Sequence, residues 1–318
     1  MMKRSRALAD RLGEPYPLGL IEVCQGIIDY CQGRWRSSRE HSDRAARILR
    51  DRCTGVAWET DTAWVFFIAS CFYLGELGEL ARRQSLLVED AHARGDLYAA
   101  TSMRSAFGNT GWLAAGDVDR ARREVRLARE QWVTGGFDIQ HMLLLLGEAF
   151  VDRYEGDGNA AWARVDAAWP AFEQSMLGRV RVVRSQMVHV RGASALAAAA
   201  DARDRAARSA LLTVAERAAR ELMSDPIAAF RPTGELLRAG IAVLRGQPER
   251  ALILLERAAS EFDTVDMPLY AAVARRRHGE LSGGEAGAAR IAAADTWMAR
   301  QGIRSPESFN RMLTPGFT

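Results

Sequence analysis

The sequence predicts an all-α fold, an α-solenoid of about 15 helices paired antiparallel. Three observations lead to this fold class. Turn-forming glycines recur about every 40 residues along the 318-residue chain. Between these turns, apolar residues repeat at intervals of three and four, the spacing that places them on one side of a helix. Only 9 residues are proline, while alanine, leucine, arginine and glutamate are abundant, so the composition also favours helix.

Two sets of breaks alternate along the chain and delimit the helices in order. The first set separates the two helices of a pair, because a left-handed glycine ends one helix and a polar residue such as Asp caps the next. It comprises Gly33, Gly75, Gly116, Gly156, the vicinity of Ala200 and Asp201, Gly246 and the stretch 282–285. The second set separates successive pairs and comprises Gly13, Gly55, Gly95, Gly135, Gly178, the stretch 224–226, the stretch 263–268 and Gly302. Pairs with a period near 40 residues stack into a superhelix, which we expect to be right-handed.

Helical periodicity is clearest in two segments that follow turns of the first set. After Gly116 the recurring apolar residues are Val118, Ala121, Val125, Ala128 and Trp132. After Gly246 they are Ala251, Leu252, Leu255, Ala258, Ala259 and Phe262. Arginines and glutamates fill the positions between them, so each segment is expected to bury one face and expose the other.

We expect a single helical-repeat domain over residues 1–318, because stacked repeats share one continuous core. Residues 1–12 correspond to the second helix of a pair without its first helix, and residues 304–318 to a short final helix and a tail. An unpaired helix at this N-terminal edge leaves an apolar patch without a covering helix, which we expect to include some of Met2, Ala7, Leu8 and Leu12. We therefore expect the chain to self-associate through this edge.

Charge and composition argue against several classes of partner. The net charge of +3 is too small to indicate a nucleic-acid partner. The four cysteines have neither disulfide nor zinc spacing. The most apolar run, residues 63–74, is too short to span a membrane. We expect a cytoplasmic protein that binds neither nucleic acid nor membrane.

Two turns resemble the centre of a tetratricopeptide repeat, in which a small residue, a Gly-Asp-like turn and a following alanine let two helices approach closely. They are residues 116–121 and 246–251. The period is longer than the usual tetratricopeptide repeat of about 34 residues, so the pairs are tetratricopeptide-like. Four stretches also resemble the C-terminal region of large multidomain bacterial serine/threonine protein kinases, namely residues 53–59, 95–100, 266–272 and 301–317.

The kinase resemblance implies a non-catalytic scaffold or sensor, the regulatory repeat region of a signalling protein, which holds a protein or peptide partner. The kinase motifs themselves are absent from this sequence, as is the Gly-x-x-x-x-Gly-Lys-Ser/Thr phosphate-binding loop. The five histidines fall in different repeats and lack metal-ligand spacing. We therefore predict no catalytic residue, no metal ligand and no cofactor.

Two candidate binding regions follow from the repeat register. Alignment on the inter-helix glycines places eight residues on the concave face, where they would line a partner groove: Ile27, Tyr30, Ala69, Phe72, Thr110, Leu113, Phe150 and Arg153. An anion site is the second candidate, on one side of a helix that carries Arg181, Arg184 and Arg191.

An alternative function is a small-molecule-binding or enzymatic domain with a pocket inside the superhelix. Its candidate residues are Arg153, Arg181, Arg184 and buried carboxylates such as Asp29. A long open groove would favour the peptide scaffold. A deep pocket with perturbed titratable groups would favour the small-molecule site.

Overall fold

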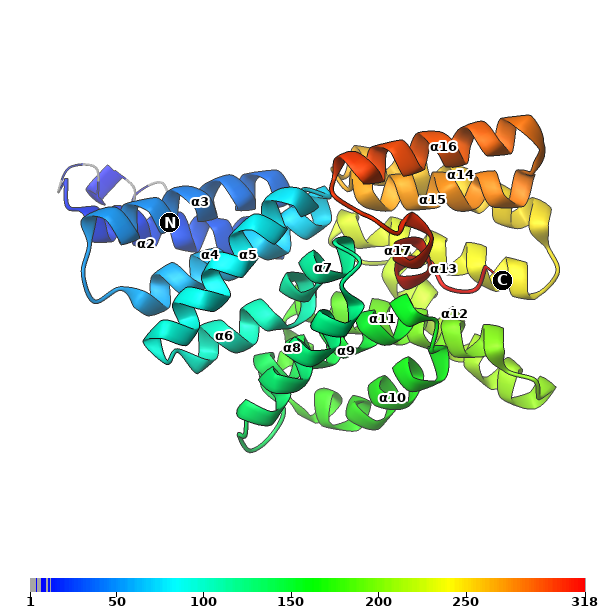
Figure 1. Cartoon of the computed structure of the whole chain (residues 1–318), viewed down its shortest axis with the longest axis horizontal. Coiled ribbons are helices and arrows are strands. Elements are labelled where there is room, and N and C mark those ends of the chain that lie inside the picture. Colours follow the sequence, from blue (N-terminus) through cyan, green and yellow to red (C-terminus); the bar gives the residue numbers. More distant parts are fainter. Residues whose placement is uncertain (1–3, 5–6, 10, 12, 318) are drawn as a thin grey trace.

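The computed structural model describes residues 4, 7–9, 11 and 13–317, and the described residues contain helices and no strand (Figure 1). The predicted all-α class is confirmed. The first half of the chain forms α2 (Pro15–Cys31), α3 (Trp35–Arg52), α4 (Ala57–Leu74), α5 (Leu77–Arg94), α6 (Leu97–Arg104), α7 (Ala106–Ala114), α8 (Val118–Gln131), α9 (Ile139–Glu155) and α10 (Gly158–Gln174). The second half forms α11 (Arg181–Asp201), α12 (Arg205–Met223), α13 (Arg231–Leu244), α14 (Pro248–Thr264), α15 (Pro268–Ser282), α16 (Gly284–Arg300) and α17 (Pro306–Leu313), with short 3-10 turns at Met176–Arg179 and Ala228–Phe230.

The glycine turns lie where the repeat pattern places them. Gly33, Gly75, Gly116, Gly156, Gly246 and Gly283 all have positive φ. At the turn between α7 and α8, the Asp117 side chain accepts a hydrogen bond from the backbone N–H of Arg120, so glycine and N-cap act as predicted. The expected helix over residues 1–12 lies largely outside the described residues. Leu8, which is described, is helical and 56% exposed.

One half-repeat differs from the others because its helix is broken in two. Ser105 is extended and Ala106 adopts a φ of 41°, so α6 ends and α7 begins within one residue. The Asn109 side-chain amide donates to the carbonyl oxygens of Arg104 and Ala121, and so satisfies a backbone group that the break frees. A Cβ on Gly147 of α9 would lie 2.8 Å from the backbone nitrogen of Ala106, so α9 packs directly against the break.

The superhelix closes on itself, and helices far apart in the sequence lie side by side (Figure 1). Gly75, at the end of α4, lies against Leu269 and Trp297 of the last repeat. Arg36 of α3 forms an ion pair with Asp266 at 2.7 Å, across 230 residues of sequence. The first and last repeats are therefore in direct contact.

The first helices of the repeats meet in one continuous core. Gln186 of α11 donates to the hydroxyl oxygens of Tyr30 and Tyr73, which come from α2 and α4. Phe72 of α4 stacks near Phe150 of α9, with ring centroids 5.9 Å apart. The largest cluster of buried apolar side chains extends from Val23 to Leu313, through nearly the whole chain.

The C-terminal segment crosses the turns of the middle repeats, and α17 lies near the centre of the molecule (Figure 1). The backbone N–H of Arg304 donates to the carbonyl oxygen of Ala114 at 2.8 Å. Phe309 of α17 is fully buried, with Tyr154 of α9 at a ring-centroid distance of 6.5 Å. This segment therefore ties α16 and α17 back to α7 and α9.

Candidate functional site

The eight residues expected to line a groove do not lie on an open surface. Seven of them are buried, and Ile27 is partly buried against the core: the buried ones are Tyr30, Ala69, Phe72, Thr110, Leu113, Phe150 and Arg153. The expected open groove is therefore corrected by the structure. Closure of the superhelix packs the inner faces of opposite repeats against each other.

The three arginines expected to form an anion site lie on α11, and each is already paired. Arg181 lies 3.1 Å from Asp225, and Arg184 lies 2.6 Å from Glu221. Arg191 lies 3.3 Å from Asp166 and places its guanidinium over the Trp169 ring. These carboxylates neutralise the three charges, so we do not assign an anion site to this side of α11.

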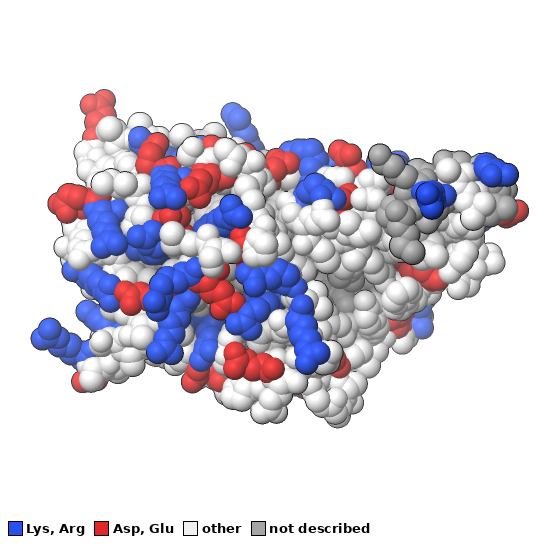
Figure 2. All heavy atoms as spheres, turned by 180° about the vertical axis from the view of Figure 1, so that it is seen from behind, with Lys and Arg blue, Asp and Glu red and all other residues white. Residues whose placement is uncertain are grey.

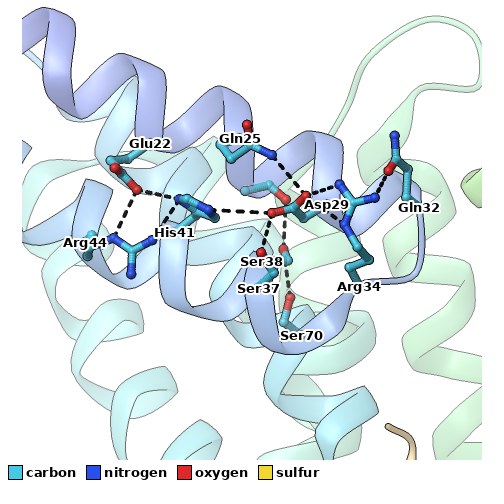
Figure 3. A network of polar contacts seen from close by, with 11 residues as sticks. Glu22, Gln25, Asp29, Gln32, Arg34, Ser37, Ser38, His41, Arg44 and Ser70 are labelled. Carbon is cyan, nitrogen blue, oxygen red and sulfur yellow. Dashed lines mark hydrogen bonds and ion pairs between the residues drawn. The ribbon is translucent and has the colours of Figure 1, made fainter. Parts of the chain in front are cut away.

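Asp29 is buried as expected, but it belongs to a network in which its oxygens are satisfied (Figure 3). It accepts hydrogen bonds from the Ser37 hydroxyl at 2.6 Å and from the Gln25 amide and Arg34 Nε at 3.0 Å. Burial raises the pKa of Asp29, but these three donors outweigh burial and hold the pKa below its ordinary value.

The same network continues along α2 and α3 through His41. His41 Nδ1 lies 2.6 Å from Glu22, whose carboxylate also accepts a hydrogen bond from Arg44 (Figure 3). The groups connect the two helices of the first pair and complete one another's hydrogen bonds. We interpret this network as structural.

A cavity of about 260 Å³ lies beneath the C-terminal segment, between α9, α11, α15 and α17. Its described lining combines three arginines, two carboxylates and small or apolar residues: Arg153, Gly156, Gly158, Ala197, Ala200, Asp201, Arg277, Glu307, Arg311, Pro315, Gly316 and Phe317. The turn at Gly156 and Gly158 is one of the predicted repeat turns. Gly158 must lack a side chain, because a Cβ there would lie 2.5 Å from the backbone of Ala197.

Arg153 is the most unusual residue of this cavity. It is only 3% exposed and forms no ion pair with a described residue. Its Nε donates to the carbonyl oxygen of Ala149, and the neighbouring carboxylate of Asp152 is already bound by Arg122 and Arg164. Burial lowers the pKa of Arg153 to about 10, so the guanidinium still carries its charge at neutral pH.

Arg277 and Arg311 bring two further charges to the cavity. Arg277 donates to the side-chain and backbone oxygens of Thr314 and pairs with Glu280 at 2.7 Å. Burial is the largest influence on the pKa of Arg277 and lowers it in spite of that pairing. Arg311 Nη2 donates to Ser308 at 3.0 Å, while its buried Nε has no hydrogen-bond partner among the described residues.

The two carboxylates of the lining are Asp201, at the end of α11, and Glu307, in the first turn of α17. Both are exposed, and neither forms an ion pair with a described residue. Burial raises the pKa of Asp201, and the nearby charge of Asp157 adds to this shift. The cavity is therefore basic in its depth and acidic at its rim.

The sequence identified only one arginine of this site. Arg153 was expected to face inward, whereas Arg277 and Arg311 were missed because they come from other repeats that only closure of the superhelix brings close. Among the described residues, no group of His, Cys, Asp and Glu side chains is placed to hold a metal ion. No described helix has a stretch long and apolar enough to cross a bilayer.

The chain was also compared with known proteins. No family model matches it, and no curated protein or solved structure gives a significant match. The fold and the cavity thus define its class by themselves, an all-α helical-repeat protein with a basic internal cavity. The kinase resemblance and the expected self-association stay predictions.

Proposed function

We propose that this chain is a non-catalytic sensor scaffold whose internal cavity binds a small anionic ligand. The observation that carries this proposal is the buried, unpaired guanidinium of Arg153. Burying an isolated charge costs several kcal/mol unless an opposite charge and hydrogen bonds compensate for it. A carboxylate or phosphate group in the cavity would supply both.

The size of the cavity limits the ligand. Its volume of about 260 Å³ lies below the roughly 300–1,000 Å³ of pockets for drug-sized molecules. A nucleotide is therefore too large, whereas a small organic acid or a free oxyanion fits. Guanidinium groups bind such anions strongly because their N–H donors match the geometry of two oxygen atoms.

The chemistry of the lining supports binding rather than turnover. The described residues that line the cavity include no Ser, Cys or His side chain that could act as a nucleophile or shuttle a proton near neutral pH. Arginine positions an anion and stays protonated, so three arginines favour recognition of charge. The lining of the cavity thus favours a small-molecule site over the expected peptide groove. The proposal still assigns the chain the expected role of a sensor.

Binding can be tested by isothermal titration with phosphate, sulfate, acetate and succinate in low-salt buffer. We expect at least one of these anions to bind, and Arg153→Met to lower its affinity about tenfold or more, because a hydrogen bond to a charged group contributes roughly 1.5–3 kcal/mol. Arg217→Met is the matched control, since Arg217 is exposed and has no described ion pair. Equal binding by the three proteins, or none by any, would overturn the proposal.

A specific surface feature favours a second candidate function, docking of an acidic protein segment. Two hollows of about 500 and 760 Å³ lie along α12, α13 and the turns beside them, and both are lined by Arg245. Arg238 pairs with Glu235 and Arg245 with Glu216. Five further arginines of the lining form no ion pair with a described residue: Arg203, Arg205, Arg208, Arg220 and Arg250. Figure 2 shows Lys and Arg side chains gathered over the left and centre of the rear view.

No aromatic side chain lines either hollow, so the stacking platforms of single-stranded nucleic-acid sites are absent from the described lining. Apolar residues such as Leu212, Met223 and Ile241 separate the charges, as suits a peptide that alternates acidic and apolar residues. Fluorescence anisotropy with a labelled peptide of that kind tests the idea. Arg205→Glu with Arg220→Glu should abolish binding, and tighter binding of an oligonucleotide of equal charge would contradict it.

A further inference from the structure

We propose that the ligand of the cavity is a small zwitterion, an α-amino acid or a close chemical relative, with its carboxylate at Arg153 and its ammonium at the Asp201–Glu307 rim. This inference rests on the proposed anion-binding function and deepens it. Opposite charges line one small cavity, yet Asp201 and Glu307 pair with none of its arginines. Such a lining is complementary to a ligand that carries both charges.

Glu307 and Arg311 do not pair, although their spacing in the sequence would allow them to. Glu307 and Arg311 are four residues apart on α17, the spacing at which a Glu and an Arg readily pair on a helix. Arg311 instead donates to Ser308 and lies against the turn at Gly156. The Glu307 carboxylate is thereby left available to a cation at the cavity mouth.

The backbone reinforces the separation of charge. Asp201 is the last residue of α11, and the C-terminal end of a helix carries partial negative charge. Gly158, the first residue of α10, lies beside Asp201, and its backbone N–H donates to the Asp201 carboxylate. The C-terminal end of α11 therefore favours an ammonium group at Asp201, while Arg153 supplies the positive charge for the carboxylate.

The rest of the lining limits the ligand's side chain. Phe317, Pro315, Ala197 and Ala200 form the apolar part, and the Phe317 ring lies 5.1 Å from the Arg277 guanidinium carbon. With a cavity of about 260 Å³, this surface accommodates a short aliphatic or polar side chain. A dianion without an amine would place a negative group near Asp201 or Glu307, which repel it.

The test uses ligand pairs that differ only in the ammonium group. The full chain is titrated calorimetrically with L-glutamate and glutarate, and with L-norvaline and valerate. We expect the amino acid of at least one pair to bind about fivefold or more tightly than its deamino partner, since an ammonium–carboxylate contact at a partly exposed rim contributes about 1 kcal/mol.

Variants of the rim then connect this preference to the two carboxylates. Asp201→Asn with Glu307→Gln should bring the affinity ratio close to one while leaving the affinity for the plain carboxylate equal or higher. Glu249→Gln is the matched control, because Glu249 is exposed and lies on another helix. All three positions are exposed, and thermal melts of the variants establish that they fold.

The outcomes separate this inference from the proposed function. If anions bind through Arg153 but the amino acids gain nothing over their deamino partners, the zwitterion is wrong and the anion site stands. If the preference persists after both rim substitutions, the assigned cation site is wrong. If neither anions nor amino acids bind, both proposals fail.

Discussion

At the scale of single residues, the charge states of a few buried side chains determine the electrostatics of the interior. Beside Arg153, the half-buried His189 of α11 is held neutral, because burial first and the charge of Arg153 second lower its pKa to about 3. The Tyr270 ring of α15 also lies close to His189, and the centroids of the two rings are 6.0 Å apart. Arg153 is therefore a fixed positive charge next to a histidine that resists protonation.

His189 should make the protein acid-sensitive. The unfolded chain takes up a proton at His189 below its ordinary pKa of about 6.5, whereas the folded chain does so only near pH 3. Stability from this residue is therefore complete above pH 6.5 and is lost as the pH falls toward 3, by at most about 1.4 kcal/mol per pH unit.

The measurement is urea unfolding between pH 7 and 4 for the wild type and His189→Gln. We expect the variant to lose less stability than the wild type over this range. Asp61 acts in the opposite direction, because burial raises its pKa to about 6, but it is present in both proteins and cancels in the difference. Identical pH profiles would show that His189 is not held neutral.

At the scale of elements, the sequence predicts the regular helices well, but it does not predict where a helix is broken. Gly116 and Asp117 form the expected turn because local backbone chemistry alone determines it. The break between α6 and α7 has no such local signal, since neither Ser105 nor Ala106 is a helix breaker of the strength of Gly or Pro. The break follows from the tertiary approach of α9 through Gly147, which a single sequence does not reveal.

A substitution at Gly108 tests how tightly the break is packed. A Cβ there would lie 2.3 Å from the carbonyl oxygen of Met103, so the backbone itself would have to move. We expect Gly108→Ala to destabilise the protein by about 1–3 kcal/mol, the usual range for overpacking. Gly135→Ala is the control, since nothing lies within 4 Å of a Cβ at that position, and denaturant unfolding that gave equal values for both would contradict the packing described.

At the scale of the whole molecule, closure of the superhelix determines which residues are accessible. The repeat register predicts Phe72 and Arg153 on the inner face, and both are buried, but periodicity does not determine how tightly a solenoid curls. Contact between Gly75 and the last repeat converts that inner face into core, and a cavity of about 260 Å³ lies beside Arg153. Periodicity therefore indicates which side chains point toward the axis of the superhelix, but it does not indicate which residues of other repeats lie beside them there.

Gly75 and Gly95 have the same backbone conformation, so a comparison of substitutions at these two positions measures how much closure of the superhelix contributes to stability. Gly75 and Gly95 end α4 and α5 with φ values of 69° and 66°. An alanine at either position costs about 1 kcal/mol of backbone strain, but a Cβ on Gly75 would also lie 2.6 Å from the Trp297 ring, while nothing lies within 4 Å of one on Gly95. Gly75→Ala should therefore lower the free energy of unfolding by more than Gly95→Ala does, and equal losses would indicate that the end of α4 does not contact the last repeat.

The central claim is that Arg153 is a binding residue kept at a cost to stability. Its most direct test is the free energy of unfolding of the wild type and Arg153→Met in urea, in a buffer without multivalent or organic anions. We expect the methionine variant to be as stable as the wild type or more so, because an apolar side chain of similar length removes an uncompensated buried charge. Adding an anion that binds the cavity should stabilise the wild type alone. If Arg153→Met instead loses several kcal/mol without ligand, Arg153 is a structural residue and the cavity is not an anion site.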